Sequence, residues 1–565
     1  MIGYICKYTP IEIIKSFDKD IERIDPSFSN FELADSLSHP NLCSYSKAVL
    51  EECFSGKYEG IILTSCCDSI RRLYDILLKK SDMKFIYMID LPRKKNSSSI
   101  SLYGNEIKKL ISYCEQHLNK QFDREKFLSI LKNTDDTSNT TDNSQINLLV
   151  AGARLKDSTA SLINSYGGNI KYNLTCTNEH RSFDFDFKAN NYLNSYAKKL
   201  LQNQYSCMRM ADISDRAEIF GKESKKVDGV LYHTVKFCDF YSYDYASINK
   251  KLNVPILKIE TDYSKQSEGQ IKTRIEAFIE SIKKSKHIDD ENSVDSQVHD
   301  KKTITAGIDS GSLSTNVVII DDEYKILSYS IIKTGAKSIE SAKKAFKEAI
   351  DSANLSENDI DYIVSTGYGR AFIPFSNKHI TEITCHAKGA HFLNKNVHTI
   401  IDIGGQDSKV IKLDENGNVI DFAMNDKCAA GTGRFLEMMA KTLEIPLESM
   451  GNESMKWKEE ITITSMCTVF AESEVVSLIA QNKERADIIM GLNNSIASRT
   501  MSLLNRIESH EDYMMSGGVA KNVGVVYAIE KKLGKKIFIP DEPQIVGALG
   551  AAIIALESIK NEEAD

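Results

Sequence analysis

The stretch ITAGIDSGSLSTNVVIID (304–321) carries the pattern that decides the fold of the second half of the chain. Two runs of apolar and β-branched residues flank the polar turn DSGSLST, and this pattern predicts a β-hairpin. A second hairpin of the same design follows in HTIIDIGGQDSKVIKLDENGNVIDFAMND (398–426). The stretch YMMSGGVAKNVGVVYAIEKKL (513–533) then predicts a strand, a Gly-Gly turn and a helix. The repeat predicts an internally duplicated α/β domain.

The three turns carry groups that suit a nucleotide. Small residues leave backbone N–H groups and hydroxyls open to phosphate oxygens, and the third turn allows close approach of an adenosine ring. The predicted nucleotide-binding residues are Gly311, Ser312, Ser314, Thr315, Gly404, Gly405, Gly517, Gly518 and Asn522. Asp309, Asp402 and Gln406 are predicted to hold Mg²⁺ and to position water. Each turn alone is also typical of an ordinary hairpin, whereas all three in this order are far more specific.

Length and composition limit the remaining possibilities. A chain of 565 residues is too long for one domain and predicts three or four. A net charge of −8 argues against a general nucleic-acid-binding protein. No apolar run of about 20 residues occurs, so no membrane span is expected. The first residues, MIGYICKYTP, do not resemble a secretory signal, and we expect a cytoplasmic protein.

Two polar stretches, KNTDDTSNTTDNSQ (132–145) and SKHIDDENSVDSQVHDKK (285–302), are typical of a loop and of an interdomain linker. They predict an α/β subdomain at 1–131, a second at 146–284 and an ATPase-like domain at 303–560. In both N-terminal segments strand-like runs alternate with helix-like runs. This alternation predicts Rossmann- or flavodoxin-like subdomains with parallel sheets and covering helices.

Twelve cysteines occur in a chain without a recognisable secretory signal. In a reducing compartment they indicate metal binding or redox chemistry rather than disulfides. Cys66, Cys67 and Cys238 each follow a strand-like run, which places them at the edge where sites gather in parallel sheets. Cys53 and Cys114 lie among apolar neighbours and are predicted to be structural. The absence of a CxxC pair argues against a zinc ribbon.

The second half resembles the superfamily of acetate and sugar kinases, Hsp70 and actin, in which one nucleotide lies between two lobes. More specifically, residues 303–560 resemble the activator ATPases of 2-hydroxyacyl-CoA dehydratases and benzoyl-CoA reductases. Besides the three turns, the motifs that carry this resemblance are STGYGR (365–370), EITCHAKGA (382–390), NDKCAAGTGRFLE (425–437) and SMCTVFAESEVVSLIA (465–480).

The resemblance implies ATP, Mg²⁺ and an iron–sulfur cluster. Cys428 and Cys467 match the ligands of that family, and two cysteines cannot fill a four-iron cubane, which takes four thiolates. The family's arrangement is a homodimer that shares one [4Fe–4S] cluster across its two-fold axis. Both cysteines precede helix-like runs, and a helix N-terminus favours a thiolate. The alternative is that the two are buried structural cysteines.

The first half resembles 2-hydroxyacyl-CoA dehydratase subunits and double-cubane cluster proteins, through HPNLCSYSKAVLE (39–51), TSCCDSIRRLYD (64–75) and VKFCDFYSYDY (235–245). The resemblance implies that Cys43, one of the pair Cys66–Cys67, and Cys238 hold a cubane. Further candidates, which would complete six ligands for a double cubane, are Cys176, Cys207 and either Cys6 or Cys67. Spacing alone leaves open whether one cubane or two are bound. A single dehydratase-like copy favours the double cubane.

Together the two resemblances imply ATP-dependent, low-potential electron transfer from the shared cluster to the N-terminal cluster, which reduces a small substrate. A ferredoxin or flavodoxin would donate the electrons, and the protein would be oxygen-sensitive and belong to anaerobic metabolism. The main alternative is a 2-hydroxyacyl-CoA dehydratase with its own fused activator, acting on an acyl-CoA. A small-molecule kinase and a chaperone-type ATP switch are further alternatives, and both predict no iron.

Overall fold

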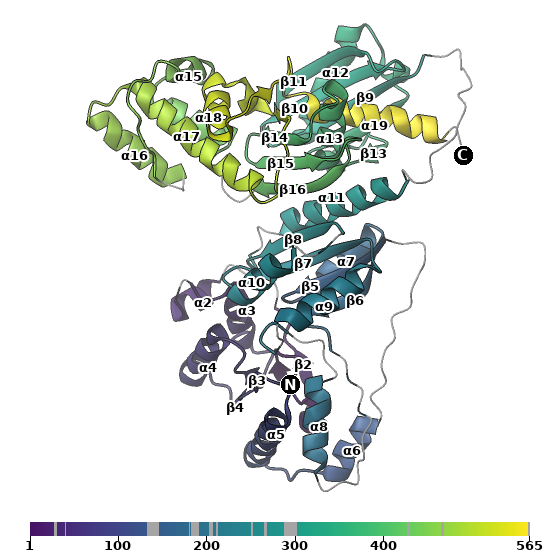
Figure 1. Ribbon diagram of the computed structural model, residues 1–565, viewed down its shortest axis with the longest axis vertical. Helices are drawn as coiled ribbons and strands as arrows, with labels where there is room; N and C mark the ends of the chain where they lie inside the picture. Colours follow the sequence, from purple (N-terminus) through teal and green to yellow (C-terminus); the bar gives the residue numbers. More distant parts are fainter. Residues whose placement is uncertain are drawn as a thin grey trace. The chain divides into compact units, whose positions relative to one another are not determined.

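The computed structural model divides into two compact units, Met1–Ile282 and Lys283–Asp565 (Figure 1). It describes residues 1–26, 31–39, 41–132, 146–179, 181, 183, 191–202, 207–210, 213–249, 252, 254–264, 268–287, 302–425, 430–464 and 468–562. The predicted loop at 132–145 and the predicted linker at 285–302 lie almost entirely outside these residues. The helix α11 (Glu268–His287) continues into the first residues of that linker.

The N-terminal unit contains two parallel four-stranded sheets with the same strand order. The first has the order β2-β1-β3-β4, and its strands are β1 (Ile2–Tyr4), β2 (Ile21–Arg23), β3 (Gly60–Thr64) and β4 (Phe85–Ile89). The second has the order β6-β5-β7-β8, with β5 (Ile146–Gly152), β6 (Gly168–Thr175), β7 (Gly229–Val235) and β8 (Ile256–Thr261). In each sheet the chain first adds a strand on one side and then crosses to the other. Crevices for ligands form at such crossing points, at the carboxyl ends of the strands.

Helices cover these sheets and close the core of the unit. They are α1 (Ile11–Ser16), α2 (Glu32–Leu37), α3 (Ser44–Cys53), α4 (Asp68–Lys80), α5 (Ser97–Leu118), α6 (Arg124–Lys132), α7 (Asp157–Ser165), α8 (Tyr192–Gln202), α9 (Ile213–Ser224), α10 (Asp239–Ile248) and α11. Helices α5 and α8 pack against each other. One apolar cluster joins the two sheets, because Ile61 and Leu63 of β3 belong to the same core as Leu149 of β5 and Val230 of β7. The two α/β halves therefore share one core.

The C-terminal unit contains two five-stranded sheets that repeat one topology. The first has the order β11-β10-β9-β12-β13, with β9 (Ile304–Ser310), β10 (Ser314–Asp321), β11 (Ile326–Lys333), β12 (Tyr362–Thr366) and β13 (Lys378–His379). The second has the order β16-β15-β14-β17-β18, with β14 (Thr399–Ile403), β15 (Ser408–Leu413), β16 (Val419–Asn425), β17 (Tyr513–Ser516) and β18 (Ile537–Phe538). In both sheets the first two strand pairs are antiparallel and the last two parallel. The predicted duplication and the α/β fold class are confirmed.

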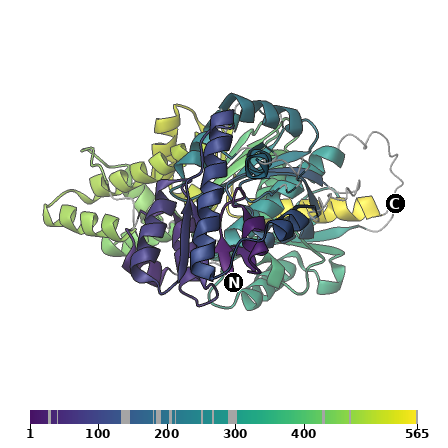
Figure 2. The same ribbon diagram turned by 90° about the horizontal axis from the view of Figure 1, so that it is seen from below.

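The helices of this unit divide between the two sheets. They are α12 (Ser338–Ala353), α13 (Glu382–Leu393), α14 (Gly433–Thr442), α15 (Leu447–Ser454), α16 (Thr468–Ala480), α17 (Arg485–Leu504), α18 (Val523–Leu533) and α19 (Val546–Glu562). Although α19 comes last in the chain, it packs on β9, β12 and α13 of the first sheet. Helices α16 and α19 lie at opposite ends of the unit in both views (Figures 1 and 2).

Small residues allow α19 to pack this closely. A Cβ atom on Gly307 of β9 would lie 1.9 Å from the carbonyl oxygen of Ala548, and one on Gly550 would lie 1.8 Å from that of Cys385. The hydroxyl of Thr305 donates a hydrogen bond of 3.0 Å to the carbonyl of Ala552. Helix α19 therefore packs tightly against β9, the strand that leads into the β9–β10 turn.

Candidate functional site

A cleft of about 560 Å³ lies in the C-terminal unit, where the two repeated hairpins face each other. The β9–β10 turn, the β14–β15 turn and the segment between β17 and α18 all contribute to its wall. The sequence-predicted residues that line it are Asp309, Gly311, Ser312, Ser314, Asp402, Gly404, Gly405, Gly517, Gly518 and Asn522. The fold thus brings the three predicted turns together around one cavity.

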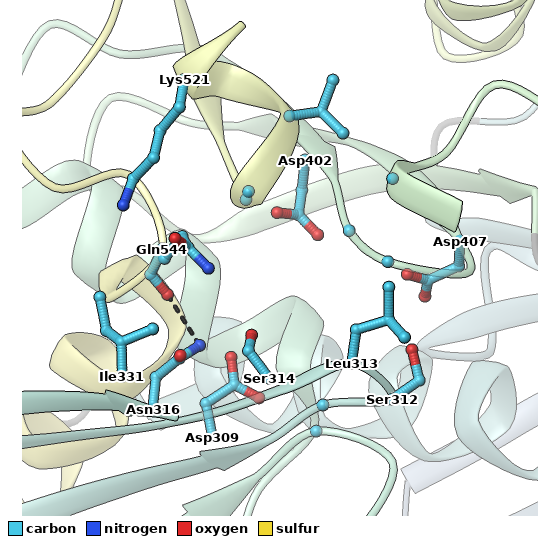
Figure 3. Close-up of a pocket in the computed structure, with 18 of the residues that line it drawn as sticks. Asp309, Ser312, Leu313, Ser314, Asn316, Ile331, Asp402, Asp407, Lys521 and Gln544 are labelled. Carbon is cyan, nitrogen blue, oxygen red and sulfur yellow. Dashed lines mark hydrogen bonds between the residues drawn. The ribbon is translucent and has the colours of Figure 1, made fainter. Parts of the chain in front are cut away.

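Two carboxylates, Asp309 and Asp402, point into this cleft from opposite sides (Figure 3). Each stands at the carboxyl end of the first strand of its sheet, β9 or β14, so the duplication places them as equivalents. Burial raises the pKa of Asp309 to about 6, and the charge of Asp402 adds to the rise. Burial acts on Asp402 too, but the charges of His386 and Lys409 and a hydrogen bond from Ser516 together lower its pKa.

Lys409 supplies the positive charge that compensates the buried carboxylates of the second hairpin. Its Nζ atom lies 2.5 Å from Oδ2 of Asp407 and 3.5 Å from Oδ2 of Asp402, and all three side chains are buried. Burial alone would lower the pKa of Lys409, but the two carboxylates raise it well above its usual value. On the far side of Asp402, the Ser516 hydroxyl donates to Oδ1 at 2.9 Å. Among the described residues, Lys409 thus compensates both Asp402 and Asp407, whereas Asp309 has no bonded cation.

The glycine turns are shaped by close packing. Gly517 has a φ of +84°, and a Cβ atom there would lie 2.4 Å from the carbonyl oxygen of Ile403. At the start of α14, the N–H groups of Gly433 and Arg434 donate to the carbonyls of Gly404 and Gly405, at 2.9 and 2.8 Å. The first turn of α14 thus holds the β14–β15 turn in place.

Two predicted site residues are not among those lining the cleft. Thr315 is fully buried, and its hydroxyl lies 3.0 Å from that of Thr334, because neighbouring side chains on a strand point to opposite faces. Gln406 is exposed and does not line the cleft. Asn522 lines it, but its side-chain oxygen also accepts hydrogen bonds of 3.1 Å from Gly524 and Val525 and caps α18.

Other residues that line the cleft were not predicted. Glu382 and His386 lie on α13, and Lys409 and Gln544 come from further elements. The backbone oxygen of Gln544 accepts a hydrogen bond of 3.0 Å from Asn316 (Figure 3). Glu382 and His386 lie in the motif EITCHAKGA, and their spacing of four residues, which places them on one face of a helix, was the available signal. Lys409 is the cross-strand partner of Asp402 in the predicted β14–β15 hairpin. No local signal marked Gln544, because its role depends on which segments the fold places together.

The N-terminal unit gathers cysteines from both of its sheets. Ten cysteines lie in the described residues, and all of them are free thiols. Seven of these ten interact electrostatically with one another: Cys6, Cys43, Cys66, Cys67, Cys176, Cys207 and Cys238. All seven N-terminal cysteines named as candidate ligands belong to this group, which we call the cysteine cluster. Cys53 and Cys114 lie apart from it and are buried.

Three members of the cysteine cluster stand directly before a helix. Cys43, Cys67 and Cys238 occupy the residues that precede α3, α4 and α10. Helix N-termini present free N–H groups and favour a negative sulfur. Burial raises the pKa of Cys43 and Cys238, and amides of the following helix offset part of this rise.

The neighbouring cysteines Cys66 and Cys67 differ in their electrostatics. The pKa of the Cys67 thiol is lowered by a hydrogen bond from Cys66 and by the amide of Ile70. The same hydrogen bond, with burial, raises the pKa of Cys66 well above its usual value. Of the two, Cys67 is therefore the better thiolate.

The donors of the cysteine cluster fit an iron–sulfur group. A four-iron cluster binds each thiolate at a different iron, and soft thiols backed by helix N-termini are the donors that such a group uses. In the described part of the chain, no three His, Cys, Asp or Glu side chains are placed to ligate one metal ion. The other predicted ligands, Cys428 and Cys467, lie outside the described residues.

The repeated sheets, with a carboxylate at the end of each first strand and a glycine-lined cleft between them, define a two-lobed nucleotide-binding ATPase. The model of the BadF/BadG/BcrA/BcrD ATPase family matches residues 306–555. Residues 6–143 and 129–282 match the model of the 2-hydroxyglutaryl-CoA dehydratase D-component. The chain belongs to the BadF/BadG/BcrA/BcrD ATPase family, and it carries the dehydratase-type half in addition. The predicted resemblances and the predicted ATP-hydrolysing activity are confirmed.

Individual relatives agree with this assignment. The chain is 42% identical over 259 residues to the 2-hydroxyisocaproyl-CoA dehydratase activator of Clostridioides difficile, covering 46% of this chain and 97% of the relative. It is 45% identical over 258 residues to the activator of lactoyl-CoA dehydratase of Anaerotignum propionicum, covering 46% and 99%. A solved structure of the Clostridium difficile activator with bound ADPNP shares 42% identity, covers 46% of this chain and 97% of that chain, and gives a TM-score of 0.45.

Among the helices of the described residues, none combines the length and the apolar character needed to cross a bilayer.

Proposed function

We propose that the chain is an ATP-driven electron-transfer protein that joins an activator and its electron acceptor in one polypeptide. The observation that carries this proposal is the convergence of seven cysteines in a chain whose other half is an ATPase. When bound, iron–sulfur clusters would supply one-electron transfer at low potential. The proposed ligands are Cys428 and Cys467, shared between two subunits, and in the N-terminal unit Cys43, Cys66, Cys67, Cys176, Cys207 and Cys238.

The cleft residues supply the ATP-dependent part of the proposal. Asp309, buried and without a bonded cation among the described residues, is the group that would hold Mg²⁺ through water, and Asp402 would face it across the phosphates. Because the two carboxylates belong to different sheets, Mg²⁺–ATP would draw the lobes together. For one electron, about 59 mV corresponds to about 1.4 kcal/mol. Lowering the reduction potential of a cluster by several times this amount costs free energy, and ATP hydrolysis would supply it.

Exposed apolar side chains on α16 support the proposed homodimer. Phe470, Val476 and Ile479 lie on this helix, which begins directly after Cys467, and Phe470 is 68% exposed. Large exposed apolar side chains on one element mark an interaction site. A second subunit that covers this helix would bring two copies of Cys467 toward one axis.

A second candidate function rests on the match of residues 6–282 to the dehydratase D-component. In this version the electron would serve the dehydration of a 2-hydroxyacyl-CoA, and the chain would need a partner dehydratase subunit. A ferredoxin or flavodoxin would donate the electron in both versions. The single dehydratase-like half favours a double cubane and a small substrate over an acyl-CoA.

Iron and acid-labile sulfide per chain, measured on protein purified without oxygen, test these proposals. About 2 irons per chain would mean the shared cluster alone, because half of a four-iron cubane belongs to each subunit. About 6 would add one N-terminal cubane and favour the dehydratase, and about 10 would favour the double-cubane reductase. A protein that binds ATP but no iron would contradict both and leave the kinase or the ATP switch.

A further inference from the structure

Three basic side chains of the N-terminal unit, Lys7, Arg154 and Arg209, bring positive charge next to the cysteine cluster. Lys7 is 1% exposed, and its Nζ atom donates to the carbonyl of Thr175 at 3.2 Å. Arg154 is 4% exposed and donates to the carbonyls of Ile5 and Ile24, at 2.8 and 2.9 Å. Arg209 is half-buried and donates to the carbonyls of Leu91 and Pro92. These partners are neutral.

Two other arginines of the same unit, both largely buried, are paired with carboxylates. Arg216 lies 2.6 Å from Asp244, and Arg181 lies 3.0 Å from Glu12. In the described residues, neither Lys7 nor Arg154 nor Arg209 forms such an ion pair. Asp25 acts on Arg154 only at longer range, and the guanidinium also lies over the ring of Tyr45. Burying a charge without an opposite partner is costly, so these three positions indicate a missing anion.

The unbalanced cations face the cysteine cluster. The ammonium of Lys7 interacts with Cys207, Cys176 and Cys6. The guanidinium of Arg154 interacts with Cys176, and that of Arg209 with Cys66. In addition, the Nε atoms of Arg154 and Arg209 are buried and have no hydrogen-bond partner among the described residues. The three residues come from both halves of the unit, and each interacts with members of the same cysteine cluster.

We propose that Lys7, Arg154 and Arg209 are the counter-charges of the iron–sulfur group in the N-terminal unit. The inference rests on the proposed function, because it needs that group to be bound. Metal-bound cysteines are thiolates, and an iron–sulfur group carries negative net charge that grows by one with each added electron. Nearby positive charge therefore favours loading of the group and raises its reduction potential. The three side chains are positioning residues, which act on the group through its charge.

Lys7 is the best residue for a test, because it bonds to one carbonyl, whereas Arg154 links two segments. The full-length protein would carry Cys428→Ser and Cys467→Ser, so that the remaining iron belongs to the N-terminal unit. In this background we would compare Lys7→Met, Lys7→Arg and Arg209→Gln. Lys47→Met is the matched control, since Lys47 is also buried but lies 2.7 Å from Asp35.

Three readouts are needed: the rate of iron loss to a chelator, the reduction potential, and the urea midpoint of the metal-free protein. The potential is measured by anaerobic titration with Ti(III) citrate and electron paramagnetic resonance. In that titration one electron passes from Ti(III) to the iron–sulfur group, and no covalent bond forms or breaks.

Lys7→Met is expected to lower the reduction potential and to speed iron loss by about tenfold or more. It should leave the metal-free protein at least as stable as before, because it removes an uncompensated buried charge. Lys7→Arg should restore the potential, Arg209→Gln should act like Lys7→Met, and Lys47→Met should leave the potential unchanged.

An unchanged potential in both Lys7→Met and Arg209→Gln, or a metal-free protein that Lys7→Met destabilises as much as the loaded one, would overturn the inference alone. A parent protein without iron in its N-terminal unit would instead overturn the proposed function.

Discussion

At the scale of single residues, Asp309 and Asp402 of the cleft show that neighbouring charges can change a pKa more than the burial that both side chains share. Asp309 and Asp402 are both buried at equivalent strand ends. Lys409 lies within ion-pair distance of Asp402, whereas Asp309 has no bonded cation in the part of the chain that the structure describes. Their pKa values consequently shift in opposite directions. The buried carboxylate of Asp309, which lines the cleft, is therefore well suited to bind a cation.

Replacement of Asp309 by Asn should stabilise the nucleotide-free, magnesium-free protein near neutral pH. The folded state holds the Asp309 proton up to a pKa of about 6, whereas the ordinary pKa of an aspartate is 3.8, so stability falls as pH rises between these values. Asn removes a penalty of at most about 3 kcal/mol. Urea unfolding at pH 5 and pH 7.5 should show the larger gain at pH 7.5. A variant that loses stability equally at both values would contradict this, and Mg²⁺–ATP should stabilise only the parent.

Replacement of Lys409 by Met should leave Asp402 and Asp407 buried without their cation. Breaking a buried pair by removal of one partner costs about 3–5 kcal/mol. Lys388→Met is the control, because the pair of Lys388 with Glu557 at 2.5 Å is partly exposed and should contribute about 1 kcal/mol or less. Equilibrium unfolding in urea measures the free energy of unfolding of both variants. Equal losses of stability would show that burial of Lys409 has little effect.

At the scale of elements, the turn between β17 and α18 depends on backbone geometry rather than on side chains. Gly517 combines a left-handed φ of +84° with contacts that leave no room for a Cβ atom. Its neighbours in that contact are the carbonyl of Ile403 and the carboxylate of Asp402. The conformation of this turn is thus coupled directly to the second hairpin.

Gly517→Ala should therefore weaken nucleotide binding by about tenfold or more, equivalent to about 1.4 kcal/mol. Gly534, at the end of α18, offers a matched control, since it also has a positive φ of +67° but open space within 4 Å of the point where a Cβ atom would lie. Gly534→Ala should cost about 1 kcal/mol of stability and leave nucleotide affinity unchanged. Calorimetric titration with ATP distinguishes them, and equal affinities would show that the turn adapts to the extra methyl group.

At the scale of the whole molecule, the proposed dimer links oligomeric state to iron content. Phe470→Glu places a charge in the exposed first turn of α16 and should shift the protein toward monomers. If the shared cluster lies at that interface, iron should fall by about 2 atoms per chain. Phe372→Glu is the control, because Phe372 is similarly exposed, at 66%, but belongs to the first lobe. Light scattering and iron analysis check both; a dimer with full iron in Phe470→Glu would contradict the proposal.

Sequence patterns predicted the elements well where the signal was local. The hairpin at 304–321, the repeat at 398–426 and the strand, turn and helix at 513–533 are all present as β9–β10, β14–β16 and β17–α18. Alternation of side chains along a strand was the finer signal that was missed. Ser314 and Asn316 line the cleft, whereas Thr315 between them faces the opposite side of the sheet.

The sequence by itself determined the turn chemistry, the duplicated hairpins and the identity of the thiols, because these depend on residue type and short spacing. Only the tertiary structure decided which distant groups meet. Cys6 and Cys207 join the cysteine cluster because two sheets share one core. The pair of Lys409 with Asp402 is local by comparison, because both lie in the β14–β15 hairpin. The role that we propose for Lys7 and Arg154 also depends on the tertiary structure, because only the fold places their charges next to the cysteine cluster. Electrostatic energy depends on distance and burial, and neither can be read from spacing along the chain.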